Sequence, residues 1–287
     1  IITSDEAIGL KTIPKSIAIM GSGAVGVEFA SIFRRFGSEV TIIELLPRLV
    51  PVEDEAVSAE LERSFKKQGI KVLTGTKVSS AKAGGSGVDI EFTAAQGSDG
   101  KAQKISAELL LVATGRGPVT SGLGAEEAGL QLDRGYVRVD QQFRTSVPGI
   151  SAIGDVITFD APGHQQLAHL SSAEGIALAE RIAGQEFRAI NYEQVPGGTY
   201  CDPEIGSVGL TEKEAQGRGY EVKIGTFKFG ILARARIAGE VEGFAKMANV
   251  TDDVLRVIGQ NRQWTKRYGV VAGLVAGWAV DPSRPPA

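Results

Sequence analysis

The 287-residue sequence contains one cysteine, Cys201, and two histidines, His164 and His169. A single cysteine excludes an internal disulfide and a dithiol redox pair within this chain. The histidines are five residues apart, which is not the i, i+4 spacing of a helical metal site, so we predict no metal. A formal net charge of -3 and the lack of a large basic cluster argue against nucleic acid as a partner.

Long hydrophobic runs are also missing. The longest apolar run near the end of the sequence, residues 268–280, is broken by three glycines, whereas roughly 20 apolar residues are needed to span a bilayer. The first 16 residues show no basic segment followed by an apolar core, so we predict no signal peptide, no membrane partner and a cytoplasmic protein. Hydrophobic residues make up 43% and charged residues 23%, which is typical of a globular protein, and the length favours two or three domains.

Apolar runs alternate with amphipathic segments in the first part of the sequence. Residues 16–20 and 39–44 have the β-branched, apolar character of buried parallel strands. An amphipathic helix at 54–68 and a strand at 71–73 follow, and this alternation of strands and helices is the signature of a parallel α/β sheet. A first helix, between the two leading strands, is expected to have its apolar stripe at Val25, Phe29, Ile32, Phe33 and Phe36.

The hydrophobic period changes at residue 77. Alternating residues over 77–105, separated by Gly, Ser and Asp turns, predict an antiparallel meander, and a buried strand at 109–113 then ends in a glycine turn. After residue 185 the pattern becomes α+β. Between these regions we expect strands at 137–140 and 150–153, and a helix at about 166–183 with an apolar stripe of Leu167, Leu170, Ala173, Ile176, Ala177 and Ile182.

Gly21, Gly23 and Gly26 form a G-x-G-x-x-G motif directly after the first strand and at the start of a helix. In this context the first glycine permits a tight turn, the second lets the backbone approach a pyrophosphate, and the third lets the helix pack closely on the strand. The phosphates would lie at the N-terminus of the helix, where unpaired N–H groups favour anions. Glu44 ends the second strand, where a carboxylate accepts hydrogen bonds from ribose hydroxyls and repels a 2′-phosphate. The unit therefore predicts NAD rather than NADP.

Several motifs in order reveal a wider resemblance. The runs are GSGAVGVEFASIFRRFGSEVTIIELLPRLVPVEDEAV, KVLTGTKV, LLLVATGRGP, AIGDV and QLAH. From about residue 1 to about 250 they closely resemble the flavoprotein disulfide reductases, and among them the dihydrolipoamide dehydrogenases. The resemblance implies a Rossmann-like α/β NAD-binding domain over 1–117 and the C-terminal segment of a FAD domain over 118–188. It also implies a partial α+β dimerisation domain over 189–258, followed by a divergent tail over 259–287 that we expect to be solvated.

The resemblance also implies which residues bind the two cofactors. Glu28 would lie near the nicotinamide and Val78 against the adenine, although from the residues alone Val78 is simply a core strand residue. Asp155 would bind the ribityl chain of the flavin; its sequence context alone makes a turn residue or a helix cap equally plausible. Cys201 falls in a segment that is structural in the family, so we expect a buried thiol. The full set for NAD is Gly21, Ser22, Gly23, Ala24, Val25, Gly26, Val27, Glu28, Glu44, Val78 and Gly115, and for FAD it is Asp155, Gln166, Leu167, Ala168 and His169.

Three family features are not found in this sequence: a glycine-rich FAD fingerprint, a redox-active cysteine pair and a histidine–glutamate pair near the end. We therefore predict no catalytic residue in this chain. The first hypothesis is a part of an NAD- and FAD-dependent oxidoreductase that acts on a dithiol or disulfide, which in the family is a homodimer associated with a lipoyl-bearing 2-oxo acid dehydrogenase complex. The alternatives are a non-catalytic NAD-binding fragment, or a related reductase such as mercuric reductase or soluble transhydrogenase.

Overall fold

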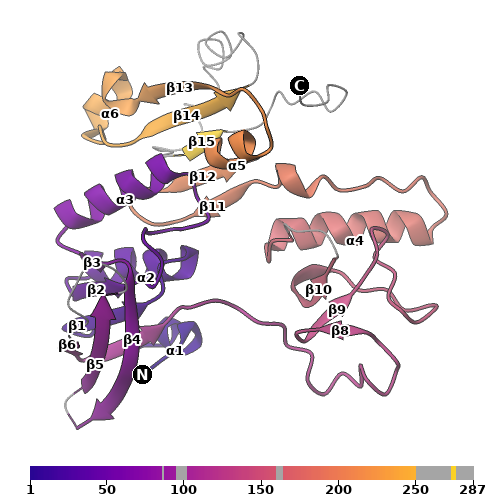
Figure 1. The fold of residues 1–287 in the computed structure, drawn as a ribbon, viewed down its shortest axis with the longest axis horizontal. Coiled ribbons are helices and arrows are strands. Elements are labelled where there is room, and N and C mark those ends of the chain that lie inside the picture. Colours follow the sequence, from indigo (N-terminus) through magenta and orange to yellow (C-terminus); the bar gives the residue numbers. More distant parts are fainter. Residues whose placement is uncertain (86, 95–101, 160–163, 250–272, 276–287) are drawn as a thin grey trace. The chain divides into compact units, whose positions relative to one another are not determined.

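The computed structural model describes residues 1–85, 87–94, 102–159, 164–249 and 273–275. The chain forms two compact units, one of residues 1–115 and 196–287 and the other of residues 116–195. Figure 1 shows the helices and strands of each unit. The predicted domain boundaries stay predictions, and the predicted tail lies largely outside the described residues.

A four-stranded parallel sheet forms the centre of the first unit, with the strand order β3-β2-β1-β7. The alternating strands and helices predicted from the sequence are therefore present. Because successive side chains of a strand point to opposite faces, Ile17 and Ile19 of β1 enter one hydrophobic cluster while Ala18 enters another. The strands are β1 (Ser16–Met20), β2 (Glu39–Ile43), β3 (Lys71–Leu73) and β7 (Leu109–Val112), and the helices are α1 (Ser4–Ile8), α2 (Ala24–Arg35) and α3 (Glu55–Lys67).

The buried face of α2 differs from the predicted stripe. Phe33 is buried as expected, but Ile32 and Phe36 are 42% and 61% exposed. Small side chains occupy the buried face instead, because α2 starts against the turn that follows β1, and this close approach leaves little room beneath its first turns. The buried residues of α2 are Gly26, Val27, Ala30, Ser31 and Phe33.

An antiparallel meander packs on the face of the parallel sheet that carries Ala18, which confirms the change of period seen in the sequence. Val88, Ile90 and Phe92 of its central strand form one buried cluster with Ala18 and other sheet residues. A β-bulge lies between Val78 and Ser80. The meander strands are β4 (Thr76–Gly84), β5 (Gly87–Ala94) and β6 (Gln103–Ala107).

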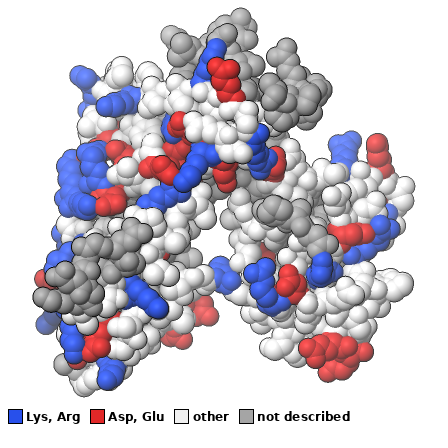
Figure 2. All heavy atoms as spheres, viewed as in Figure 1, with Lys and Arg blue, Asp and Glu red and all other residues white. Residues whose placement is uncertain are grey.

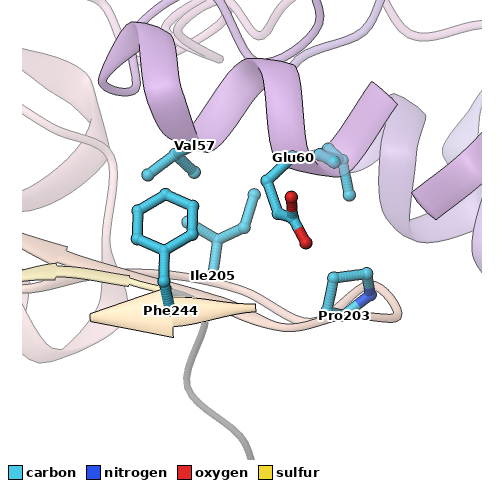
Figure 3. A pocket seen from close by; sticks show the side chains of 6 residues that line it. Val57, Glu60, Pro203, Ile205 and Phe244 are labelled. Atoms are coloured by element: carbon cyan, nitrogen blue, oxygen red, sulfur yellow. The ribbon is translucent and has the colours of Figure 1, made fainter. Parts of the chain in front are cut away.

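The later part of the first unit is a five-stranded mixed sheet with the order β11-β12-β15-β14-β13. Figure 3 shows how it meets α3: Val57 and Glu60 of the helix face Pro203, Ile205 and Phe244 across a small, mostly apolar pocket. The elements are β11 (Gly197–Thr199), β12 (Ile205–Val208), α5 (Glu212–Gly217), β13 (Lys223–Lys228), the 3-10 helix η3 (Phe229–Ile231), α6 (Ala233–Ala238), β14 (Phe244–Asn249) and β15 (Gly273–Val275). Residues 273–275, which lie in the tail that was expected to be solvated, form β15 between β12 and β14.

A buried lysine joins this sheet to the start of α3. The Nζ of Lys246, in β14, donates to both carboxylate oxygens of Asp54 at 2.9 and 3.0 Å and to Glu212 Oε2 at 2.6 Å. Asp54 also caps the N-terminus of α3 by accepting from the Ala56 N–H. Burial opposes the charge of Lys246, but the hydrogen bonds and the two carboxylates outweigh it and raise its pKa. Outside this cluster, Figure 2 shows Lys and Arg side chains next to Asp and Glu side chains on the face it presents.

The second unit has a three-stranded sheet, β10-β9-β8, packed with the helix α4 around Phe143, Ile157 and Ala177. The predicted helix is present, but Ala173, Ile176 and Ile182 of its expected stripe are exposed. The predicted strand at 150–153 is wrong: it makes only an isolated bridge between Ser151 and Arg144. The elements are β8 (Leu132–Asp133), β9 (Tyr136–Arg138), the 3-10 helix η1 (Gly154–Val156), β10 (Ile157–Thr158), α4 (Ala168–Ile182) and the 3-10 helix η2 (Tyr192–Gln194). Among the described residues, no helix is long and apolar enough to cross a membrane.

Candidate functional site

Gly21 and Gly26 fix the turn between β1 and α2. Gly21 has a φ of 102°, and a Cβ placed there would lie 2.4 Å from the Ala113 carbonyl oxygen. A Cβ on Gly26 would lie 2.1 Å from the carbonyl oxygen of Gly21. Both distances are far inside van der Waals contact, so only glycine lets the helix begin this close to the strand. This is the geometry that the sequence motif predicts.

Gly23 differs from these two glycines because nothing lies within 4 Å of the position where its Cβ would be. It is the N-cap of α2, with φ -65° and ψ -177°, and because glycine has no side chain, no side-chain hydrogen bond caps the helix. The N–H groups of the first helical turn have no intrahelical acceptors, and they carry the positive end of the helix dipole. An anionic group that approaches Gly23 therefore meets open backbone donors, and a pyrophosphate fits this chemistry.

Glu44, immediately after β2, is 7% exposed and is held by three hydrogen bonds. Its Oε2 accepts from the backbone N–H of Ser22 at 2.7 Å and from the Ser22 hydroxyl at 2.8 Å, and its Oε1 accepts from the Leu46 N–H at 2.7 Å. A carboxylate offers about four lone-pair sites, so one further donor, such as a ribose hydroxyl, fits on Oε1. The Glu44 carboxylate, which the sequence predicts to bind the ribose, is thus fixed in place beside the glycine turn.

The other predicted NAD residues of the turn have unequal access. The Ser22 N–H and hydroxyl are engaged by Glu44, so Ser22 orients that carboxylate. Val27 is fully buried in the core and donates its N–H to the Gly23 carbonyl at 3.1 Å, so its side chain is inaccessible and its N–H is already engaged. Ala24 is exposed and Val25 is half-buried at the start of α2. The contacts of these residues with NAD stay predictions.

Glu28, Val78 and Gly115 lie on α2, on β4 and after β7 of the same unit. Glu28, one turn into α2, accepts a hydrogen bond from the Tyr200 N–H at 2.7 Å, an interaction that the sequence did not predict. Val78 is half-buried against the second hydrophobic cluster, at the bulge of β4. Gly115 is exposed, with a φ of 140° that favours glycine and nothing within 4 Å of its Cβ position.

The predicted FAD residues gather at two places in the second unit. Asp155 is the central residue of η1, and no described residue donates a hydrogen bond to its carboxylate, so this group is open to the hydroxyls of a polyol. The Gln166 side chain donates to the Asp155 backbone carbonyl at 3.1 Å, which ties this turn to the segment before α4. Leu167 is the N-cap of α4, and Ala168 and His169 are exposed in its first turn.

A buried carboxylate, which the sequence did not predict, lies behind this turn. Glu174 is 0% exposed and accepts from the Gly154 N–H at 2.7 Å and from the Tyr192 hydroxyl at 2.9 Å. His164 Nε2 lies 3.2 Å from Glu174 Oε1. Burial raises the pKa of Glu174, but the hydrogen bonds from these three partners outweigh it and lower the pKa overall. Burial and the negative charge of Glu174 raise the pKa of Tyr192.

Cys201 is 3% exposed, as expected for a structural thiol. Its Sγ donates to the Pro203 carbonyl oxygen at 3.1 Å, and burial raises its pKa to about 12. The pocket of Figure 3 contains none of the predicted cofactor residues. The glycine turn, Glu44 and the open N-terminus of α2 are therefore the arrangement with the clearest ligand chemistry.

Comparison with known families agrees with this arrangement. The pyridine nucleotide-disulphide oxidoreductase family matches residues 1–175, and the dimerisation domain of the same family matches residues 195–261. The first match covers more than half of the chain. The chain therefore belongs to the pyridine nucleotide-disulphide oxidoreductase family, whose cofactors are NAD and FAD, as expected from the sequence.

Among curated proteins, the chain is similar to dihydrolipoyl dehydrogenases. It is 40% identical over 286 residues to the enzyme of Chlorobaculum tepidum, covering 95% of this chain and 59% of that protein. It is 43% identical over 249 residues to the enzyme of Mycobacterium tuberculosis, covering 86% of this chain and 52% of that protein. The chain thus spans about half the length of these relatives. The alignment with the Chlorobaculum tepidum enzyme and the dimerisation-domain match run beyond residue 250, so the resemblance extends further than expected from the sequence.

Solved structures give the same assignment. The flavoprotein disulfide reductase RclA from Escherichia coli has a TM-score of 0.76 and 28% identity, over 86% of this chain and 54% of that chain. LpdA from Mycobacterium tuberculosis has a TM-score of 0.77 and 27% identity, over 88% of this chain and 52% of that chain. The predicted α/β fold class is confirmed by these neighbours together with the observed sheets.

Proposed function

We propose that this chain supplies the NAD-binding site and part of the FAD-binding site of a dihydrolipoyl dehydrogenase-like oxidoreductase. The observation that carries the proposal is the glycine turn of Gly21, Gly23 and Gly26 beside the anchored carboxylate of Glu44. When bound, NAD and FAD supply hydride transfer, which runs from reduced flavin to NAD+ while a dithiol substrate is oxidised to a disulfide. The 40 to 43% identity to dihydrolipoyl dehydrogenases favours this reaction over that of mercuric reductase or transhydrogenase.

In this proposal the residues of this chain bind the two cofactors and orient them. Gly23 and the open N-terminus of α2 receive the pyrophosphate, because backbone N–H groups and the helix dipole favour an anion there. Glu44 accepts from a ribose hydroxyl on its remaining site and disfavours a 2′-phosphate. Val78 would lie at the adenine, and Glu28 and Gly115 at the nicotinamide end.

On the flavin side, Asp155 would bind the ribityl hydroxyls. Gln166, Leu167, Ala168 and His169 would line the flavin at the start of α4, where no side chain caps the helix. The match of residues 195–261 to a dimerisation domain supports a homodimer, and a lipoyl-bearing 2-oxo acid dehydrogenase complex is the larger partner that we propose, in the cytoplasm.

A purified chain tests the proposal when it is mixed with FAD and examined by absorption spectroscopy, NADH titration and NADH-dependent dye reduction. The proposal predicts NADH binding and a bound flavin spectrum. The alternative of a non-catalytic NAD-binding fragment predicts NADH binding with no bound flavin and no dye reduction. Lipoamide turnover is not expected from this sequence alone, because it contains one cysteine. A chain that binds neither NADH nor FAD would contradict both hypotheses.

A further inference from the structure

Glu174 is a carboxylate that is completely buried in the second unit, on the second turn of α4. Its oxygens meet donors from three other segments of the chain. Oε2 accepts from the Gly154 N–H at 2.7 Å, and Oε1 accepts from the Tyr192 hydroxyl at 2.9 Å and lies 3.2 Å from His164 Nε2. A buried carboxylate is tolerated only when it has such partners, so this cluster is stable only if all three segments are held together.

The aromatic rings around Glu174 keep water away from these hydrogen bonds. The Phe159 ring lies 5.0 Å from the Tyr192 ring and 5.7 Å from the His164 ring, measured between centroids, and the His164 side chain is 9% exposed. The hydrogen bonds from His164, Gly154 and Tyr192 lower the pKa of Glu174 despite its burial. The carboxylate is therefore charged at neutral pH, and its bond to the Gly154 N–H is charge-assisted.

The Gly154 N–H belongs to the turn that carries Asp155. Gly154 has a φ of 79°, which favours glycine, and its Cβ position would lie 3.3 Å from the Ser171 hydroxyl of α4. Gln166 holds the far side of the turn through the Asp155 carbonyl at 3.1 Å. The turn is thus held by Glu174 of α4 on one side and by Gln166, just before α4, on the other, while the Asp155 carboxylate meets no donor among the described residues.

We propose that Glu174, supported by His164 and Tyr192, is a positioning residue of the flavin site. It holds the Gly154–Asp155 turn against α4, so that the Asp155 carboxylate and the uncapped N-terminus of α4 have a fixed geometry toward one ligand. This inference rests on the proposed function, which identifies that ligand as FAD. We call the hydrogen bonds by which Glu174 holds this turn the clamp. The clamp is a property of the ligand-free chain, and it is testable without any cofactor.

Amide hydrogen exchange of the full chain measures the clamp directly, through the amides of residues 154 and 155. Loss of a charge-assisted hydrogen bond in Glu174→Ala is expected to speed exchange of the Gly154 amide about tenfold or more. Glu174→Gln keeps a carbonyl oxygen that accepts from Gly154, so it should restore most of the protection. Glu180→Ala, on the same helix, is the matched control and should change nothing at this turn. Unchanged protection in Glu174→Ala, with α4 still protected, would refute the clamp.

FAD titration of the same variants tests the link to the flavin. Glu174→Ala should weaken FAD binding about tenfold while NADH affinity stays at the wild-type value, and Glu174→Gln should recover most of the FAD affinity. A wild-type chain that binds NADH but not FAD would count against the flavin part of the proposed function, whereas hydrogen exchange would still test the turn without any cofactor. A wild-type chain that binds FAD, with unchanged FAD affinity in Glu174→Ala, would overturn the positioning role of Glu174, so the two failures are distinguishable.

Discussion

Replacing Gly23 and Gly26 by alanine separates the ligand-binding role of the glycine turn from its structural role. Gly23 has backbone angles that any residue adopts and no atom within 4 Å of its Cβ position. Alanine is a poorer N-cap than glycine by roughly 0.5 to 1 kcal/mol. It also gains about 0.4 to 1 kcal/mol by restricting the unfolded chain. The free energy of unfolding of Gly23→Ala should therefore stay within about 1 kcal/mol of the wild-type value.

Gly26→Ala has the opposite character, because its methyl group would meet the Gly21 carbonyl oxygen at 2.1 Å. Overpacking of this kind typically costs about 1 to 3 kcal/mol. In a chain of this size each kcal/mol lowers the melting temperature by roughly 2 to 4 °C, so we expect a fall of about 2 to 12 °C.

Thermal melting without ligand and calorimetric titration with NADH distinguish the two variants. Gly23→Ala should melt like the wild type but bind NADH at least about tenfold more weakly, since its methyl group occupies the path of the pyrophosphate. Wild-type NADH affinity in Gly23→Ala, or an unchanged melting temperature in Gly26→Ala, would refute this reasoning.

Two further predictions concern buried groups of the first unit. Lys246→Met leaves Asp54 and Glu212 without their shared cation, so it should lower the free energy of unfolding by about 3 to 5 kcal/mol in a denaturant titration. Lys213→Met, which removes an exposed pair with Glu55, is the control and should cost less than about 1 kcal/mol; equal effects would contradict the prediction. Cys201 should resist a thiol reagent at pH 8 in the folded chain and react once it is unfolded, because it is 3% exposed and burial raises its pKa to about 12. The folded-state pKa of Cys201 lies above the unfolded value of 9.0, so the stability that the buried neutral thiol contributes is complete below pH 9 and is lost as the pH rises towards about 12. A fast stoichiometric reaction with the reagent at pH 8 would show that the thiol is not buried.

The parallel α/β part of the first unit was predictable from the sequence because its glycines and apolar runs act locally. Gly21 and Gly26 are required by contacts with residues near them in the β1–α2 turn and with Ala113, and the motif encodes that requirement directly. The stripe of α2 was less predictable: periodicity favoured Ile32 and Phe36, whereas the close approach of the helix to the sheet selects smaller side chains at the buried positions.

The residues that the sequence did not reveal depend on long-range contacts. Nothing in the local sequence marks Glu174 or Lys246 as buried, yet both are, and the partners of Glu174 lie 10 to 20 positions away in the sequence. Lys246 meets Asp54 across 192 positions, and nothing in the local pattern of either residue signals the other. The predicted strand at 150–153 fails for a similar reason, since an apolar run becomes a strand only where a partner strand is available, and here only Ser151 finds one.

The central claim is that residues 16–44 hold NAD, with Glu44 at the adenosine ribose. Paired titrations of the wild-type chain with NADH and NADPH test it most directly. A Glu44→Arg variant is a less direct test, because it would also remove the acceptor of the Ser22 and Leu46 N–H groups and so disturb the turn itself. A 2′-phosphate set against this buried carboxylate brings like charges together, so NADH should bind about tenfold to a hundredfold more tightly than NADPH, a difference of roughly 1.4 to 2.8 kcal/mol. Equal affinities, or tighter binding of NADPH, would contradict the account.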